Sequence, residues 1–387
     1  MTVLFKQGAG RKPGFGPRVF QALLAGAALI LTMLGPAGAQ PPIHLTDLAG
    51  HEVVLKAPAQ RILIADGRFL IALALIHPDP GSLLSAWPHD IDRIGPDGYE
   101  QLRQRSPGLA ALPKTAISAA AQSVEQILAV NPDLAIFSLD SRLSAEERAR
   151  IEAAGIPVLM IDFFIHPLAH VGPSLRLLGQ ATGRADQAEA FIAFRQAHLD
   201  ILAKRLEGLA DRDRPSVFLE PHAGISEECC TSPGNGNIGD YIGLAGGDNI
   251  GREVIPTAAG RLNLEYVIAR APSVYIATGG PYMERRGGVV LGPGFTPERA
   301  RDSLVRAVGR RGFAELPAVR DKRAYGLSHQ LLNSPLDILA AEMLAKAIHP
   351  ERFADLDPGR TLDAINRDFL AFTLHGVYWT SLADGGL

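Results

Sequence analysis

Cysteine is scarce in this 387-residue sequence, which contains only the adjacent Cys229 and Cys230. Two cysteines can form at most one disulfide bond, which cannot stabilise a chain of this length. A fold held together by disulfides is therefore excluded, and hydrophobic cores must stabilise the protein. An excess of one charge is also lacking, because 38 basic residues stand against 41 acidic ones and no basic run occurs. This balance argues against a nucleic-acid partner.

Signatures of catalysis are missing too. The sequence contains neither a G-x-S-x-G nor a G-x-x-x-x-G-K-[ST] motif, and its glycine-rich GLAGGDNIG stretch does not match G-x-G-x-x-G. No Ser/His/Asp set and no pair of carboxylates stands out as catalytic machinery. An α/β enzyme is therefore the less favoured interpretation, and we expect no catalytic residue and no resident cofactor.

The sequence does contain ample apolar material. Hydrophobic residues make up 47% of the chain and charged residues 20%, a composition that is typical of globular domains and excludes disorder as the main state. The length indicates two or three domains of ordinary size.

A positively charged start precedes one long apolar run. Residues 1–46 hold four basic residues and no acidic one, and Phe20–Leu34 is predominantly apolar. A Gly-Pro turn and the small residues Ala37–Ala39 follow, an order that is typical of a secretory signal peptide cleaved after Ala39. An uncleaved membrane anchor is the alternative, because Val19–Ala39 is just long enough to span a bilayer.

Cleavage predicts a mature chain that starts at Gln40 and has no further segment long and apolar enough to cross a membrane. A bacterial lipoprotein needs a cysteine directly after its cleavage site, and Gln40 occupies that place. We therefore expect a soluble periplasmic protein without a lipid anchor.

Short apolar runs alternate with helical segments along the rest of the chain. Arg61–Asp66, Leu134–Phe137 and Pro157–Ile161 are predicted buried strands, and Ser82–Trp87 is a further strand candidate. Ser216–Glu220 opens a second set of the same kind. Strands that alternate with helices predict a parallel sheet that is covered on both faces.

One segment breaks this alternation. Ala185–Leu209 has neither proline nor glycine until Gly208 and places apolar residues at helical spacing, so it predicts one helix of about 20 residues and roughly 30 Å. We therefore predict an α/β fold of two Rossmann-like lobes with central parallel sheets, joined by this one long connecting helix, with the ligand cleft between them. The predicted boundaries are 1–39 for the signal peptide, 40–184 for the N-terminal lobe, 185–209 for the connecting helix and 210–387 for the C-terminal lobe.

The two halves share a local pattern. Gln122–Phe137 aligns with Leu262–Ala277, and four of sixteen positions are identical, including Glu125 with Glu265. Any helix–proline–strand unit can produce such a match, but the two segments occupy corresponding positions in the order of elements of the two α/β halves. The match therefore favours a duplicated lobe.

Four parts of the sequence carry a resemblance to a known family: Thr46–Gly67, Ser123–Phe137, Tyr241–Gly251 together with Leu262–Ala277, and Asn333–Leu362. By their order and spacing, the chain resembles the substrate-binding proteins of ABC importers for iron complexes and cobalamin, which have two lobes on a rigid helix. The last part is similar to the ferric-siderophore branch. The resemblance implies capture of a ferric siderophore or related iron complex and its delivery to the permease dimer of the inner membrane. Haem or cobalamin is the alternative cargo, and we expect a monomer.

The resemblance also implies a docking role for two glutamates. In this family an acidic residue on each lobe pairs with arginines of the permease, and by motif position these residues are Glu125 and Glu265. Each lies near the start of a short predicted helix, after polar residues, where an exposed carboxylate is expected. A first-turn glutamate that only complements the helix dipole is the alternative.

Ligand contacts should come from the loops that follow the strands. Ferric siderophores present hydroxamate or catecholate oxygens, which suit arginine donors, and aromatic rings supply a flat contact face. Our candidates are Arg68, Trp87, Tyr282, Arg285 and His329. Trp87 could instead belong to a core, Arg68 could cap a helix or face solvent, and Arg285 could lie in a solvated loop.

The histidines leave a second possibility open. His222 and His329 follow predicted strands, and one of them could be an axial ligand of haem iron or cobalt. The eleven histidines show no cluster of the kind that holds a bare Zn²⁺ or Mn²⁺ ion, so we expect no metal site of that type.

The adjacent Cys229 and Cys230 also allow more than one state. An oxidising compartment permits a vicinal disulfide, although the distance between adjacent Cα atoms, about 3.8 Å, is below the usual disulfide range. Reduced thiols and a soft-metal site are the alternatives. An oxidised pair is expected to shape the wall of the cleft.

Overall fold

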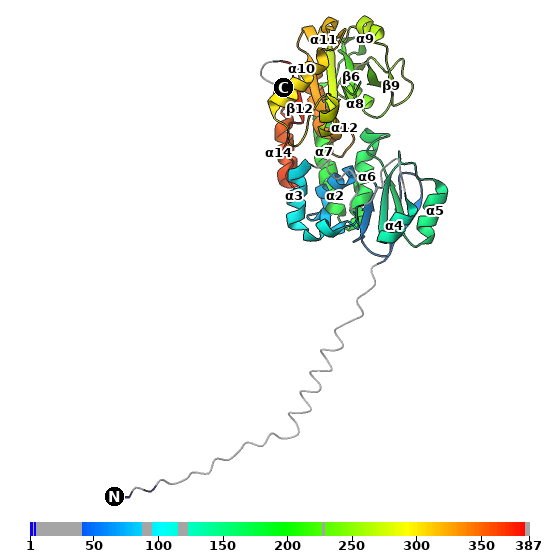
Figure 1. Ribbon diagram of the computed structural model, residues 1–387, viewed down its shortest axis with the longest axis vertical. Coiled ribbons are helices and arrows are strands. Elements are labelled where there is room, and N and C mark those ends of the chain that lie inside the picture. The colour runs from blue at the N-terminus through cyan, green and yellow to red at the C-terminus, as the bar shows by residue number, and fades with distance from the viewer. Residues whose placement is uncertain (3, 5–40, 87–94, 115–122, 227–228, 384–387) are drawn as a thin grey trace. The chain divides into compact units, whose positions relative to one another are not determined.

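The computed structural model describes residues 1–2, 4, 41–86, 95–114, 123–226 and 229–383 (Figure 1). Residues 1–42 and 43–387 are separate units, and the second unit carries the fold. The candidate ligand residue Trp87 lies outside the described residues, as does the predicted signal peptide, 1–39, apart from three residues at its start. Within the described ranges, no helix combines the length and the hydrophobicity needed to cross a bilayer.

The N-terminal lobe is built on a three-stranded parallel sheet with the order β3-β4-β5. An antiparallel hairpin, β1-β2, precedes it. All residues of the three parallel strands are buried, as expected for a sheet that helices cover on both faces. The elements are β1 (Ile43–Thr46), β2 (Glu52–Leu55), β3 (Ile62–Ile64), α2 (Arg68–Ile76), α3 (Gly95–Arg105), α4 (Val124–Val130), β4 (Leu134–Ser138), α5 (Ala145–Ala153), β5 (Val158–Ile161) and α6 (Pro167–Thr182).

The predicted strand at Ser82–Trp87 is wrong in its described part. Pro80–Leu83 forms a 3-10 helix, η1, because proline starts the turn and the side chain of Asp79 accepts a hydrogen bond from the amide of Ser82. Leu84 alone makes a parallel bridge, to Ile62 of β3.

The C-terminal lobe contains a five-stranded sheet with the order β12-β11-β10-β6-β8. Its strands are parallel except for β12, which pairs antiparallel with β11. A small antiparallel pair, β7-β9, forms a separate sheet next to β6. The elements are β6 (Ser216–Glu220), β7 (Thr231–Pro233), α8 (Gly239–Leu244), β8 (Asp248–Asn249), β9 (Ala259–Arg261), α9 (Leu264–Arg270), β10 (Val274–Gly279), η5 (Pro281–Arg286), α10 (Pro297–Val308), α11 (Pro317–Arg320), β11 (Ala324–Ser328), α12 (His329–Leu332), α13 (Asp337–Ile348), α14 (Pro358–Asp368) and β12 (Trp379–Ser381). The predicted two-lobed α/β fold with parallel sheets is therefore confirmed.

The long helix α7 (Ala185–Arg205) follows the first lobe. It begins just after Gly183, which ends α6 with a φ of 68° and lets the chain reverse. It ends at Arg205 rather than at Leu209, before Gly208 with its φ of 76°. The helix packs against α2 and α6 of the N-terminal lobe and against α13 of the C-terminal lobe.

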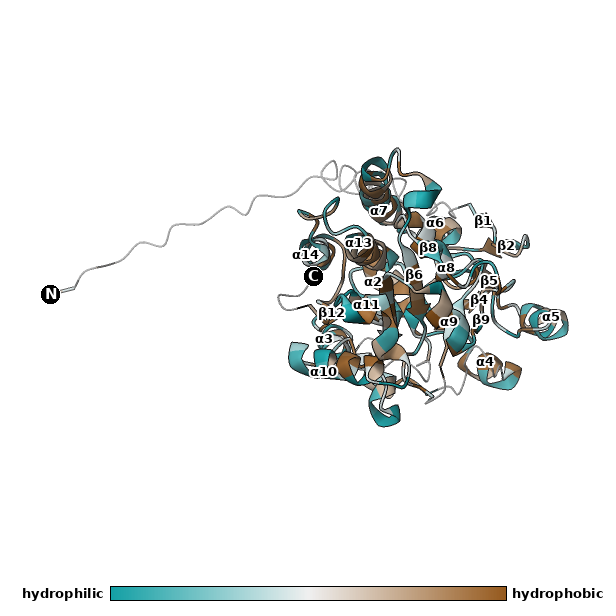
Figure 2. Ribbon diagram, turned by 90° about the horizontal axis from the view of Figure 1, so that it is seen from above, coloured by the Kyte–Doolittle hydropathy of each residue, from teal (hydrophilic) through white to brown (hydrophobic). Residues whose placement is uncertain are grey.

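A single hydrophobic core runs through both lobes. It includes Leu70 of α2, Phe191 of α7, Ile276 of β10 and Ile338 of α13. Every residue of α2 is buried, and α13 buries all of its residues but Lys346. Figure 2 shows brown, hydrophobic strands near the centre of the view and teal faces on outer helices such as α5 and α10. Because separating the lobes would expose this apolar surface to water, the shared core favours one fixed arrangement.

A buried polar contact crosses the same core. Two nitrogens of Arg195 in α7 donate to the carboxylate of Asp337 in α13, at 2.8 and 2.5 Å. The hydroxyl of Tyr241 in α8 donates to the same carboxylate at 2.7 Å. Burial, and then the charge of Asp337, raise the pKa of Tyr241, so its hydroxyl keeps the proton that it donates.

A second connection joins the end of the chain to the N-terminal lobe. The amide of Ala371 donates to the carbonyl of Ala74 in α2 at 2.9 Å. The side chain of Gln101 in α3 donates to the carbonyl of Thr373 and accepts from its amide, at 3.1 and 2.8 Å. The helix α7 is therefore not the only link between the lobes. The local patterns of the sequence do not predict this second link.

Replacing Asp337 by alanine is expected to lower the free energy of unfolding by about 3–5 kcal/mol, because the guanidinium of Arg195 stays buried without its counter-ion. Urea denaturation of both proteins measures the difference. The matched control is Asp355→Ala. It removes the exposed partner of Arg205, which lies on α7 like Arg195, and it should lower the free energy of unfolding far less. Equal losses in the two variants would contradict this account.

Candidate functional site

One pocket is lined by residues from both lobes and has a volume of about 270 Å³. Its lining residues follow the carboxyl ends of parallel strands, where ligands of α/β proteins usually bind. In the N-terminal lobe, Arg68 follows β3 and Phe164 follows β5. In the C-terminal lobe, His222 follows β6, Tyr282 follows β10, and three residues in and after α12 follow β11. The lining residues are Arg68, Phe164, His222, Tyr282, His329, Gln330 and Asn333.

Arg68, at the start of α2, is held by the carboxylate of Asp66. Its Nε donates to both carboxylate oxygens at 2.9 and 3.0 Å, and one terminal nitrogen donates at 2.5 Å. The side chains of Arg68 and Asp66 are 11% and 5% exposed. The guanidinium also lies over the ring of Phe164, 5.8 Å from its centre. The structure therefore places Arg68 at the pocket with its charge already paired.

His222, Tyr282 and His329 form a cluster on the wall that belongs to the C-terminal lobe. Nδ1 of His222 lies 2.6 Å from the hydroxyl of Tyr282, and the rings of His222 and His329 are 4.1 Å apart between centres. Thr278 at the end of β10 joins the two histidines, because its hydroxyl accepts from the amide of His222 and contacts Nδ1 of His329 at 2.9 Å. The cluster gathers ring nitrogens and a phenol oxygen at one place.

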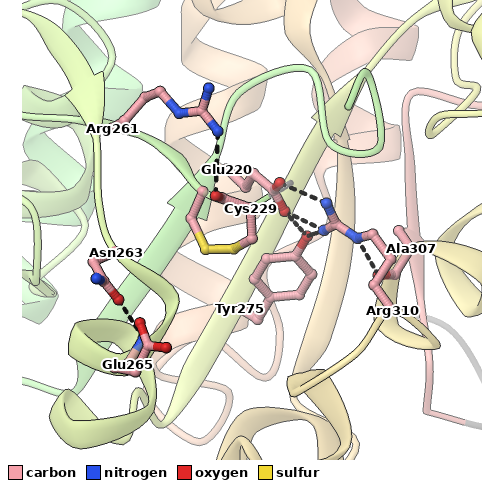
Figure 3. The surroundings of a disulfide bond; sticks show 9 residues. Glu220, Cys229, Arg261, Asn263, Glu265, Tyr275, Ala307 and Arg310 are labelled. Carbon is pink, nitrogen blue, oxygen red and sulfur yellow. Dashed lines mark hydrogen bonds and ion pairs between the residues drawn. A yellow bond between two sulfur atoms is a disulfide. The ribbon is translucent and has the colours of Figure 1, made fainter. Parts of the chain in front are cut away.

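His222 has a left-handed backbone with a φ of 53°. Non-glycine residues adopt this conformation rarely, and it persists only where the surroundings enforce it. The nearby Glu220 is part of such a rigid environment. Its buried carboxylate accepts two hydrogen bonds from Arg310 and one from the hydroxyl of Tyr275 (Figure 3). This network fixes the end of β6 and thereby the position of His222.

Asn333 contributes an unsatisfied acceptor. Its side chain is almost fully buried and lines the pocket, and its Nδ2 lies 3.3 Å from Nε2 of His329. Its Oδ1 has no hydrogen-bond partner among the described residues. Buried amide oxygens are seldom left in this state, so a donor from a bound molecule would complete the site.

Three of the five predicted ligand residues therefore lie at the pocket: Arg68, Tyr282 and His329. Arg285 is exposed on η5 and is not among the lining residues. The sequence pattern does not single out three other lining residues, Phe164, Gln330 and Asn333. The only signal for them was their place after β5 and β11, and that signal applies equally to every residue of the same loops.

The two predicted docking glutamates occupy matching positions. Glu125 and Glu265 lie in the first turns of α4 and α9, seven-residue helices that are capped by Ser123 and Asn263. Both helices end on a residue with a positive φ, of 43° and 45°, and lead into β4 and β10. Both carboxylates are exposed, so the two lobes present similar acidic sites.

Glu125 also forms an ion pair with a neighbouring helix. Arg150 of α5 donates to it at 2.9 Å, and the Glu125 side chain is 72% exposed. Its own backbone amide and then Arg150 lower the pKa of the Glu125 carboxyl, which therefore stays ionised.

Cys229 and Cys230 are joined by a disulfide bond (Figure 3). Cys230 is fully buried against a core of the C-terminal lobe that includes Leu262 and Ile255. Its carbonyl accepts from the amide of Leu262 at 2.8 Å, next to the β7-β9 pair. Neither cysteine lines the pocket, so the expectation that the ring shapes the cleft wall is not met.

Within the described ranges, no group of three or more His, Cys, Asp or Glu side chains is arranged to hold a metal ion. The cluster at the pocket therefore offers donors to a metal but not a complete cage.

Comparison with known proteins gives a consistent result. A sequence model of the family described as periplasmic binding protein matches residues 75–331. No curated protein sequence matches this chain.

Solved structures share the fold over most of the chain. The TroA-like periplasmic binding protein FepB from Veillonella parvula is 26% identical with a TM-score of 0.77, covering 88% of this chain and 100% of that one. CeuE from Helicobacter pylori, in a Ni-His complex, is 18% identical with a TM-score of 0.62, covering 87% and 97%. A periplasmic haem-binding protein from Pseudomonas aeruginosa is 20% identical with a TM-score of 0.53, covering 76% and 94%.

Alkylation of the denatured protein without a reductant is expected to label neither cysteine, because Cys229 and Cys230 are bonded to each other. Mass spectrometry counts the labels, and a reduced sample provides the control with two. Two labels in the unreduced sample would contradict the disulfide.

Proposed function

The chain belongs to the family of periplasmic binding proteins, and on this premise we propose that it is the solute-binding component of an ABC importer. It captures a ferric siderophore or a similar iron complex at the pocket of Arg68, Tyr282 and His329 and delivers it to a permease dimer in the inner membrane. It acts as a monomer and needs neither a resident cofactor nor a catalytic residue.

The contact between His222 and Tyr282 is the observation that carries this proposal. Imidazole nitrogen and phenol oxygen both ligate iron in proteins, and here the two atoms lie 2.6 Å apart at the pocket. Two or three such groups are too few to hold a bare ion, but they can contact an iron complex. They act as ligands where the chelator leaves a position on the iron open, and as hydrogen-bond partners of the chelating oxygens where it does not. The free oxygen of Asn333 adds an acceptor for a donor group of that chelator.

Haem or cobalamin is the second candidate cargo. Either His222 or His329 can serve as the axial ligand of a haem iron or a cobalt, and a haem-binding protein shares the fold. The pocket volume of about 270 Å³ lies just below the usual 300–1,000 Å³ of small-molecule sites. A ferric siderophore and a haem both exceed this volume, so either cargo would extend beyond the pocket into solvent.

The remaining parts of the chain complete the proposal. Residues 1–39 act as the export signal, 40–184 and 210–387 form the two lobes, and 185–209 contain the rigid connector. Because the lobes share one core, ligand binding moves them by a few degrees only. Glu125 and Glu265 pair with arginines of the permease.

Removal of the imidazole by His222→Ala or of the hydroxyl by Tyr282→Phe is expected to weaken binding of the iron complex by on the order of tenfold or more. The reason is that each change removes a polar group that contacts the iron complex, as a ligand of the iron or as a hydrogen-bond partner of the chelating oxygens. Quenching of tryptophan fluorescence measures the affinity, and absorbance of protein purified from its own periplasm distinguishes a ferric siderophore from a haem or a corrin.

Arg285→Ala is the matched control, because Arg285 is exposed on the same η5 segment as Tyr282 but does not line the pocket. Its affinity should equal that of the unmodified protein. A loss that is as large for Arg285→Ala as for Tyr282→Phe would place the binding site elsewhere.

Reversal of either docking charge, by Glu125→Lys or Glu265→Lys, is expected to reduce ligand-dependent ATPase stimulation of the reconstituted permease. Ligand affinity should not change, because neither residue lines the pocket. The effect should be weaker at high salt, since exposed ion pairs are screened.

Glu146→Lys and Glu298→Lys provide the controls for docking. Both residues are also exposed glutamates in the first turn of a helix, α5 and α10, one in each lobe. If all four reversals reduce stimulation alike, the effect comes from the helix dipole or from net charge and not from docking.

A further inference from the structure

We infer that Asp66 makes the pocket selective for iron complexes of low net charge, because it neutralises the only permanently charged side chain among the described lining residues, Arg68. This inference rests on the proposed function and specifies its substrate class. The other described lining residues are a phenylalanine, a tyrosine, a glutamine, an asparagine and two histidines. A ligand with several negative charges would therefore find no unpaired arginine there.

The carboxylate of Asp66 holds the guanidinium of Arg68 in a fixed position. Nε and one terminal nitrogen of Arg68 donate to the two oxygens of Asp66 in a fork, at 2.9, 3.0 and 2.5 Å. Such paired bonds between a planar guanidinium and a carboxylate are strong and hold a defined orientation. With exposed fractions of 11% and 5%, both side chains are shielded from water, and their attraction is weakened less by salt than that of a surface pair.

Asp66 also compensates a second positive feature at the same place. Arg68 is the first residue of α2, where backbone amides carry a partial positive charge. The amide of Arg68 donates to an oxygen of Asp66 at 2.8 Å. No acidic residue lies in the first turn of α2 itself, so this carboxylate is the acid that serves both the guanidinium and the helix end.

The consequence follows from the charges of ferric chelates. Each hydroxamate brings one negative charge, so three of them around Fe³⁺ give a neutral complex. Each catecholate brings two, so three of them leave a complex with three negative charges. Placing a multiply charged anion in a partly buried site without a free counter-charge costs more than placing a neutral complex there. The pocket should therefore prefer the neutral complex.

The test compares two probes, a neutral ferric tris-hydroxamate and a trianionic ferric tris-catecholate, by titration of the full-length mature protein. The unmodified protein should bind the hydroxamate more tightly. Asp66→Asn releases the charge of Arg68, so the ratio of the two affinities should shift toward the catecholate by on the order of tenfold. Catecholate binding by this variant should also weaken as salt is added.

The double variant Asp66→Asn with Arg68→Gln is the matched control, because it removes both charges and keeps a polar side chain at both positions. Its affinity ratio should return to that of the unmodified protein. Thermal melting verifies the fold of each variant; if Asp66→Asn does not fold, Arg68→Gln alone serves, and its uncompensated Asp66 should shift the ratio further against the catecholate.

The outcomes separate the two claims. The role of Asp66 is overturned if the unmodified protein binds the catecholate more tightly, or if neither variant changes the affinity ratio. In both cases, binding of either iron complex still supports the proposed function. If neither iron complex binds, the proposed function fails, and the charge preference fails with it.

Discussion

The arrangement of the two lobes depends on the buried contact between Arg195 and Asp337, which crosses from α7 to α13 inside a core that both lobes share. Two charges taken out of water are tolerated only where the geometry is good and further hydrogen bonds satisfy them, and Tyr241 supplies such a bond. The pair therefore fixes the register of α7 against α13. Because β3 and β5 belong to one side of this contact and β6, β10 and β11 to the other, it also fixes the two walls of the pocket.

The pocket wall of the C-terminal lobe is rigid for a related reason. His222 keeps a rare backbone conformation beside a buried network in which Glu220 is bonded to Arg310 and Tyr275. Its side chain is then held by Tyr282 and lies beside the ring of His329, which is tilted against it by 46°. A site whose donors are positioned before the ligand arrives loses less conformational entropy on binding. The architecture thus favours capture without large rearrangement, which suits a protein that must bind and release one cargo repeatedly.

The local features of the fold could be predicted from the sequence, and the long-range ones could not. Apolar runs and their spacing predict β3, β4, β5 and α7, because strands and helices have fixed periods. Ser82–Trp87 has the composition of a strand, but Pro80 and the cap by Asp79 favour a turn there. Arg68 lines the pocket, yet its pairing with Asp66 depends on side-chain direction, which sequence spacing does not show. Asn333 is distinguished only by its burial and its unpaired oxygen, and neither can be seen in a sequence.

Residues near the C-terminus contact the first lobe, and these contacts affect the order in which the chain folds. Gln101 and Thr373, which exchange two hydrogen bonds, are 272 residues apart in the chain, and Ala371 closes a similar loop onto α2. Contacts between such distant residues slow folding, because a long loop must close before they form. The contacts of α2 and α3 with residues 371–373 therefore form only after almost the whole chain has been synthesised. The first lobe acquires this part of its packing last, when the second lobe is already present.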